Sequence, residues 1–167
     1  RFGGSDTVRV PLAPGINITT SDFSLEAWVK LGDNGGLIVG NLDVNNRPHW
    51  MLVVDGDKLG VSVNANTGTR LLRSYSVEKD RWYHLVGVRE GDNLSLYVNG
   101  EFLGKMSGVR GNVNSGKDVY LGRNFKGCLD EVRIYGRALS AEEILNNYRG
   151  AVFVHDFKMI NKYLSDF

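Results

Sequence analysis

The stretch GCLDEVRIYGRALSAEEI, residues 127–144, joins a strand pattern directly to the start of a helix. Polar and apolar residues alternate over 128–135, as expected for a strand with one buried face. Ser140 is a favoured N-cap residue, and Glu143 three positions later completes a capping box. Leu139 and Ile144 flank this pair as a hydrophobic staple. The stretch therefore predicts a strand followed by one short helix at about 140–148.

The same alternation places Asp130 on the inward face of the strand, together with Cys128, Val132 and Ile134. An unpaired charge in an apolar interior is too costly to keep, so Asp130 is expected to have a partner. The partner is either a metal ion, a nearby arginine or backbone N–H groups. The Cys128 thiol is expected to be buried and inert rather than a nucleophile.

The rest of the chain is a series of short strand patterns separated by turn residues. FSLEAWVK (23–30) alternates with a period of two, and Asp55-Gly56 and Asn99-Gly100 are strong hairpin signals. Further strand patterns are LIVG (37–40), WMLVV (50–54), KLGVSV (58–63), RLLRSYSV (70–77), WYHLVGVRE (82–90), LSLYV (94–98), EFLGK (101–105) and DVYLGR (118–123). About a dozen short strands without alternating long helices predict an all-β fold, a two-sheet antiparallel jelly-roll sandwich.

Length and charge narrow the organisation and the partners. The 167 residues suit one domain, predicted at 1–150, with an extension at 151–167 that packs on the body or contacts a neighbour. A net charge of +1 and the lack of a long apolar run argue against nucleic-acid binding and membrane insertion. The single cysteine allows no internal disulfide. The chain opens at Arg1 without Met, which favours a processed chain or a domain of a larger protein.

Six stretches follow one another in a specific order along the chain. They are RFGGSDTVRV (1–10), FSLEAWVK (23–30), RWYHLVGVRE (81–90), LSLYVNGE (94–101), VYLGR (119–123) and FKGCLDEVRIYGRALSAEEI (125–144). In this order they resemble the laminin G-like, pentraxin-like jelly-roll domains of the concanavalin A-like lectin/glucanase superfamily. The resemblance implies one concave and one convex sheet, in a module for extracellular adhesion or carbohydrate recognition. Residues 41–75 and 149–167 carry no motif of that family.

The resemblance also implies a structural calcium ion between the first loop and the strand of residue 130. The implied ligands are Asp6, a backbone oxygen near Gly3 or Gly4, and Asp130. Gly3 stands where the family often has an acidic residue, so one possible ligand is missing. Calcium takes six to eight oxygen ligands, and a site here would depend on backbone and water oxygens as well.

The residues give little support to catalysis. The glucanases of the superfamily place an acid and a nucleophile on one strand face, whereas the adjacent Asp130 and Glu131 point to opposite faces. Glu26 and Glu131 are each expected to be ordinary solvated carboxylates. His49, His84 and His155 lack the spacing of a zinc site. His84 alternates with Val86 and Val88, which is typical of a core-facing, hydrogen-bonded imidazole. We therefore predict that the chain is not an enzyme.

Carbohydrate binding requires an aromatic face and planar polar groups, and three segments supply them. The predicted ligand contacts are Asn45, Asn46, Arg47, His49 and Trp50 in one loop, Arg73 and Tyr75 on one face of a strand, and Arg123 and Asn124 at a strand end. Loops on rigid β scaffolds are common binding surfaces. For each residue alone, a core aromatic or a solvated charge is the alternative.

These observations predict a non-catalytic recognition module, extracellular or on the cell surface, that binds a glycan and belongs to a larger chain. The alternative is a protein-contact or structural module of a surface assembly, such as an adhesin, a pilus or a virion protein. Seven apolar residues of the C-terminal segment favour it, since they are unusual for a free end: Val152, Val154, Phe157, Ile160, Tyr163, Leu164 and Phe167.

Overall fold

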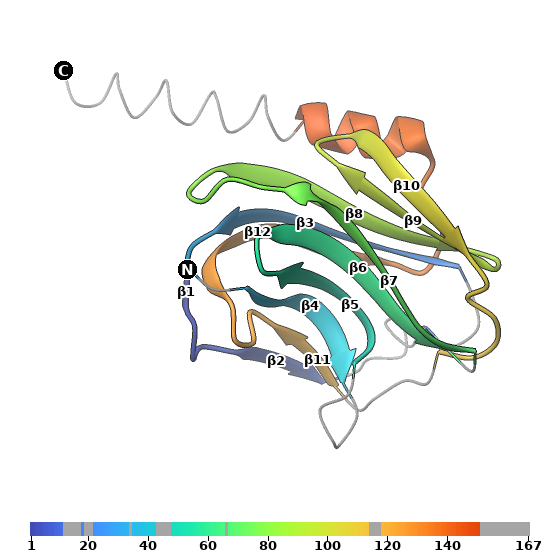
Figure 1. The fold of residues 1–167 in the computed structure, drawn as a ribbon, viewed down its shortest axis with the longest axis horizontal. Coiled ribbons are helices and arrows are strands. Elements are labelled where there is room, and N and C mark those ends of the chain that lie inside the picture. Colours follow the sequence, from blue (N-terminus) through green and yellow to red (C-terminus); the bar gives the residue numbers. More distant parts are fainter. Residues whose placement is uncertain are drawn as a thin grey trace.

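Two antiparallel six-stranded sheets pack face to face in the computed structural model, and a helix covers part of the outside of one of them (Figure 1). The structure describes residues 1–11, 18, 22–33, 35–42, 48–65, 67–113 and 118–150. The first sheet has the order β1 (Phe2–Gly3), β12 (Lys126–Tyr135), β3 (Phe23–Leu31), β8 (Trp82–Glu90), β9 (Asn93–Val98) and β10 (Glu101–Ser107). The second has the order β2 (Val8–Pro11), β11 (Asp118–Leu121), β4 (Gly36–Leu42), β5 (Pro48–Asp55), β6 (Lys58–Ala65) and β7 (Gly68–Ser76). The predicted all-β jelly-roll sandwich is confirmed.

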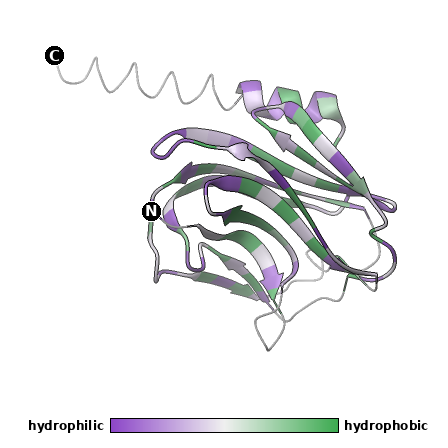
Figure 2. Ribbon diagram, viewed as in Figure 1, coloured by the Kyte–Doolittle hydropathy of each residue, from purple (hydrophilic) through white to green (hydrophobic). Residues whose placement is uncertain are grey.

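The main core lies between the two sheets, where alternate residues of each strand meet. Phe23 and Leu25 of β3 and Leu85 of β8 enter it from the first sheet, and Trp50 and Leu52 of β5 enter it from the second. All five side chains are fully buried. The colouring by hydropathy shows the alternation along the strands (Figure 2). This period of two is the pattern that identified the strands in the sequence.

The helix, residues 141–150, begins as its capping residues predict. The Glu143 N–H donates to Ser140 Oγ at 3.2 Å, and the Ser140 N–H donates to Glu143 Oε2 at 2.9 Å. Hydrogen bonds from Arg137 and from the Ser140 backbone lower the pKa of Glu143 to about 2. Leu139 and Ile144 are buried in a small second core, as the staple requires. The capping box and the staple are therefore both confirmed.

The second core lies between the helix and the outer face of the first sheet. Ile144 and Leu139 pack there against Val86 and Val88 of β8. Because the helix covers this face, β3 and β8 are buried on both sides over most of their length.

Among the described residues, no helix has both the length and the apolar character that crossing a membrane requires.

Asp130 does not face inward as the sequence alternation suggested. A β-bulge lies between Asp130 and Arg133, and Glu131 within it has a left-handed φ of 49°. The extra residue reverses the alternation, so that Leu129 and Val132 pack against the core while Asp130 is exposed. Its carboxylate accepts a hydrogen bond from the Glu131 N–H at 2.9 Å. The inward placement of Asp130 is therefore wrong.

Cys128 is affected in the same way, because it lies on the same side of β12 as Asp130. It pairs with Lys30 of β3 and is half-buried on the outer side of the first sheet. The expectation of a fully buried thiol is wrong. The apolar extension 151–167 lies outside the described residues, so the predicted division at residue 150 stays a prediction.

Candidate functional site

A hollow of about 290 Å³ opens on the outer face of the second sheet and is called the outer hollow below. Its lining residues come from β4, β5 and the turn after β11: Gly36, Leu37, Leu42, Pro48, Met51, Val53, Arg123 and Asn124. Met51 and Val53 alternate with the core residues of β5, so they form an apolar floor on the outer side. The outer hollow thus combines an apolar floor with two polar residues, Arg123 and Asn124, which form its polar rim.

The turn that carries the polar rim is held in place by its backbone. The Arg123 carbonyl accepts a hydrogen bond from the Leu37 N–H at 2.9 Å, and Asn124 adopts a left-handed φ of 54°. The Arg123 guanidinium lies 5.8 Å from the centre of the Tyr120 ring. Asparagine tolerates the left-handed conformation better than most residues, which explains its presence at this turn.

The structure places one of the three predicted ligand segments, Arg123 and Asn124, at the outer hollow. Arg123 and Asn124 line it, and so does Pro48, which directly follows the predicted loop residues. Asn45, Asn46 and Arg47 lie outside the described residues. The third segment, on the edge strand β7, is separated from β4 by two strands, a distance of about 14 Å.

Two of the predicted contacts lie inside the protein. Trp50 is fully buried between the sheets, with its ring 6.3 Å from that of Phe23, and His49 is buried as well. A side chain of the core offers no surface to a ligand, so the prediction of Trp50 as a ligand contact is wrong. Its indole packs into the sandwich from a strand whose other side carries the outer hollow.

Arg73 and Tyr75 are both exposed on β7, with the buried Ser74 between them. Arg73 makes an ion pair with Asp55, and a bulge in the β6–β7 pairing lies between Arg73 and Ser76. Residues 73–75 nevertheless keep the alternation of exposed and buried positions, and the role of Arg73 and Tyr75 as ligand contacts stays a prediction.

The residues of the implied calcium site are not brought to one place. Gly3 pairs with Lys126, four residues or about 13 Å along β12 from Asp130. Because β1 is antiparallel to β12, the chain after Gly3 leads away from Asp130. Asp6 accepts a hydrogen bond from the Gly3 N–H at 2.5 Å. As a set, the three residues do not fit one calcium ion, and among the described residues no group of three or more His, Cys, Asp or Glu forms a metal site.

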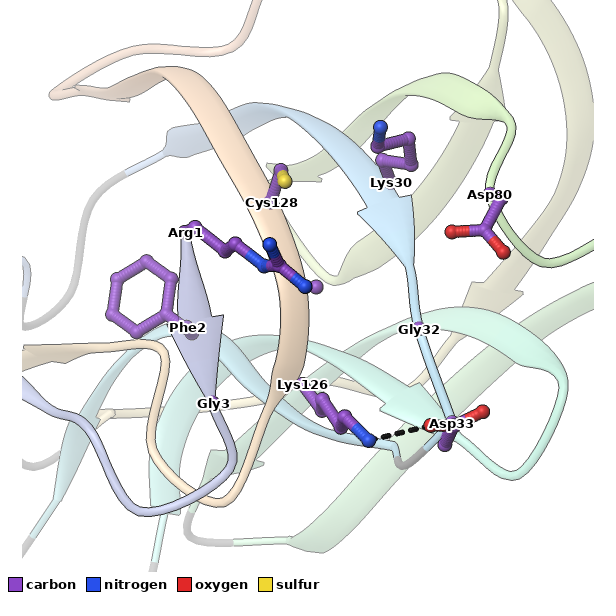
Figure 3. A pocket seen from close by; sticks show the side chains of 10 residues that line it. Arg1, Phe2, Gly3, Lys30, Gly32, Asp33, Asp80, Lys126 and Cys128 are labelled. Atoms are coloured by element: carbon purple, nitrogen blue, oxygen red, sulfur yellow. Dashed lines mark hydrogen bonds and ion pairs between the residues drawn. The ribbon is translucent and has the colours of Figure 1, made fainter.

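A second cavity, of about 390 Å³, lies where β1, β12 and β3 meet and is called the charged cavity below (Figure 3). Half of the residues that line it are charged; the lining consists of Arg1, Phe2, Gly3, Lys30, Gly32, Asp33, Asp80, Lys126, Gly127 and Cys128. Sequence reasoning missed this cavity, because its residues come from four separate segments that only the sheet order brings together.

Sequence reasoning also missed a buried polar cluster beneath the helix. Glu26 is fully buried rather than solvated, and its carboxylate has four partners. His84 Nε2 and the Tyr135 hydroxyl each lie 2.7 Å from it, the Asn147 amide nitrogen 3.1 Å and an Arg133 guanidinium nitrogen 3.4 Å. The expectation of a solvated Glu26 is wrong, whereas that of a buried, hydrogen-bonded His84 is confirmed.

Glu26 and His84 of the cluster are fully buried, and Asn147 and Tyr148 connect the helix to them. The ring of Tyr148 stacks on Trp28 at 5.7 Å and lies 5.9 Å from His84. Burial alone would raise the pKa of Glu26, but the hydrogen bonds from His84 and Tyr135 and the charges of His84 and Arg133 lower it below its ordinary value. The carboxylate therefore stays ionised in the interior, where its donors replace water.

Acid is expected to remove the stabilisation that Glu26 provides. Because folding lowers its pKa, the ionised carboxylate contributes fully above the unfolded-state value of 4.5, and the contribution is lost as the pH falls through the lower folded-state value. Urea unfolding of the wild type and Glu26→Gln at pH 7 to 3 measures this. The difference in free energy of unfolding should shrink as the pH falls below 4.5. A difference that does not change with pH would contradict the assignment.

Three solved structures share this fold at low sequence identity. The receptor binding domain of botulinum neurotoxin D superposes with a TM-score of 0.73 at 17% identity over 90% of this chain and 43% of that chain. The binding domain of botulinum neurotoxin DC, in complex with rat synaptotagmin II, gives 0.69 at 14% identity over 86% and 40%. A heptameric SAP-like pentraxin from Limulus polyphemus gives 0.65 at 20% identity over 86% and 78%. The chain thus spans about two fifths of the toxin domains.

Sequence comparison defines the family. No curated protein matches the chain. A family model described as the concanavalin A-like lectin/glucanases superfamily, laminin G type, matches residues 2–145. This match covers every described strand and the first turn of the helix. The chain therefore belongs to the concanavalin A-like lectin/glucanase superfamily.

Proposed function

We propose that the chain is a non-catalytic, extracellular recognition module that binds carbohydrate in the outer hollow. The observation that carries the proposal is the combination of an apolar floor with the guanidinium of Arg123 and the amide of Asn124. An apolar surface accepts the C–H face of a sugar ring, and planar donors form paired hydrogen bonds with its hydroxyl groups. The predicted loop residues 45–47 directly precede Pro48 at this site.

The composition of the outer hollow also supports a role without catalysis. Glycoside hydrolysis requires two carboxyl groups on either side of the scissile bond. None of the described residues that line the outer hollow is acidic. Glu26, the fully buried carboxylate of the first sheet, has its hydrogen-bonding capacity occupied by its four partners.

Arg123→Ala is expected to weaken glycan binding at least tenfold while leaving the fold intact. A hydrogen bond to a charged group contributes about 1.5–3 kcal/mol, and the turn itself is held by the Arg123 backbone, which the substitution keeps. A glycan array identifies the ligand class, and calorimetric titration of the wild type and the variant gives the affinities. Arg110→Ala is the matched control, since Arg110 is exposed and contacts Asp92 outside the outer hollow.

The titration is run once with calcium and once with a chelator, because calcium binding stays a prediction. Two results would count against the proposal. One is that no glycan class binds the folded protein in either condition. The other is that Arg123→Ala binds as tightly as Arg110→Ala.

The alternative function is contact with a protein partner. The binding domain of botulinum neurotoxin DC, which has a similar fold, is in complex with a protein, synaptotagmin. On this chain, Phe102 is 52% exposed on β10, an edge strand of the first sheet, next to Tyr97 at 5.3 Å. An edge strand with an exposed aromatic residue is a common site of protein contact. This function takes the place of the first if the glycan experiments are negative.

A further inference from the structure

The charged cavity contains two kinds of charged side chain, those that neutralise one another and those that do not. Lys126 Nζ lies 2.5 Å from the Asp33 carboxylate, and Lys79 adds a second, longer contact of 3.7 Å to the same group. The Lys126 and Lys79 contacts lower the pKa of Asp33, so this carboxylate stays ionised and paired at neutral pH. The pair forms one rim of the cavity (Figure 3).

The remaining charges of the cavity have no ion partner among the described residues. Arg1 and Lys30 supply two positive charges, and Asp80 supplies one negative charge. Arg1 and Asp80 stand on opposite sides of the cavity in Figure 3. A carboxylate opposite a guanidinium, with space between them, is an arrangement that a small ligand of complementary charge can complete.

The backbone around the cavity positions Lys30, one of the unpaired cations, and Asp80, the unpaired anion. Lys30 lies near the end of β3, and its ammonium group is 5.7 Å from the centre of the Trp82 ring. Asp80 has a left-handed φ of 59°, and its N–H donates to the Leu31 carbonyl at 2.8 Å. The neighbouring backbone is tightly packed, because a Cβ at Gly127 would lie 2.2 Å from the Lys30 carbonyl oxygen. Backbone contacts thus fix the positions in the chain from which the side chains of Lys30 and Asp80 extend.

We propose that the charged cavity binds a small carboxylate that carries a hydrogen-bond donor on the adjacent carbon, as in a hydroxy acid or an amino acid. The ligand carboxylate contacts Arg1 and Lys30, and the neighbouring hydroxyl or ammonium group donates to Asp80. The volume of about 390 Å³ is in the range of small-molecule sites. This inference does not depend on carbohydrate binding in the outer hollow.

Titration of the ¹⁵N-labelled protein with glycolate, glycine and acetate tests the proposal by NMR at low ionic strength and pH 7. Glycolate and glycine share the carboxylate and the adjacent donor, whereas acetate lacks the donor. We expect saturable shifts of the amides of Gly32, Asp80 and Gly127 with glycolate or glycine, and at least tenfold weaker binding of acetate. Comparison of glycolate with glycine shows whether the cavity prefers a hydroxyl or an ammonium group as the donor to Asp80.

Two variants assign the roles of the charges. Lys30→Gln should weaken all three ligands about tenfold, whereas Lys58→Gln, an exposed lysine of β6 outside the cavity, should change none of them. Asp80→Asn keeps a residue that tolerates the left-handed φ and should weaken glycolate and glycine about tenfold without weakening acetate. Non-saturable shifts, equal effects of the two lysine variants, or an Asp80→Asn effect of the same size on acetate would overturn the proposal.

Discussion

Glu26→Ala is expected to lower the free energy of unfolding by about 3–5 kcal/mol, the usual cost of removing one partner from a buried charged network. The substitution leaves His84, Tyr135 and Asn147 with polar atoms that have lost their acceptor in the interior. These three groups belong to β8, β12 and the helix, so the loss affects the contact between the helix and the first sheet. Urea unfolding measures the free energy, and the melting temperature should fall by about 10 °C for a chain of this size.

A second glutamate serves as the control for this experiment. Glu78 is exposed, and its ion pair with Arg81 at 3.5 Å is solvated on both sides. Solvated ion pairs of this kind contribute little, so Glu78→Ala should change the free energy of unfolding by less than about 1 kcal/mol. Equal effects of the two substitutions would show that the Glu26 cluster does not stabilise the fold.

Trp50→Ala is expected to destabilise the protein by about 3–5 kcal/mol, the usual cost of truncating a large core aromatic. The indole is fully buried and contacts the ring of Phe23 across the interface of the two sheets. Its removal leaves a cavity that the stiff strands on either side cannot fill. Denaturant unfolding measures the loss. If Trp50 were a ligand contact instead, the variant would lose glycan binding while keeping its unfolding free energy.

Tyr75→Ala is the matched aromatic control for Trp50. Tyr75 is 54% exposed on the edge strand β7, and its truncation leaves no internal cavity. The free energy of unfolding should change by about 0.5 kcal/mol or less. A loss as large as that of Trp50→Ala would mean that burial does not distinguish the two aromatic residues.

The features that the sequence predicted correctly are local ones. The capping box of Ser140 and Glu143 involves residues three positions apart, so its geometry follows from the sequence itself. The hairpin signals Asp55-Gly56 and Asn99-Gly100 depend on the same kind of local preference, and each leads into a turn between paired strands; the first turn consists of Gly56 and Asp57. Strand alternation identified the two-layer architecture because each strand had to bury one face.

The errors arose where one residue changed the register or where tertiary contacts decided burial. Nothing in CLDEVRIY marks the bulge at Glu131, and this one extra residue moved Asp130 from the expected core face to the surface. Glu26 was expected in solvent because its strand alternates, but the helix that covers it comes from more than a hundred residues later in the chain. Trp50 lies next to a polar loop, and the sequence does not show on which face of β5 an indole will lie.

The outer faces of the two sheets differ in what covers them. On the first sheet the helix occupies the middle, and the described cavity there is confined to the end near β1. The second sheet has no described helix over it, and the outer hollow opens on that side. The outer hollow and the charged cavity therefore belong to different sheets, and ligands of the two sites would reach the module from different sides.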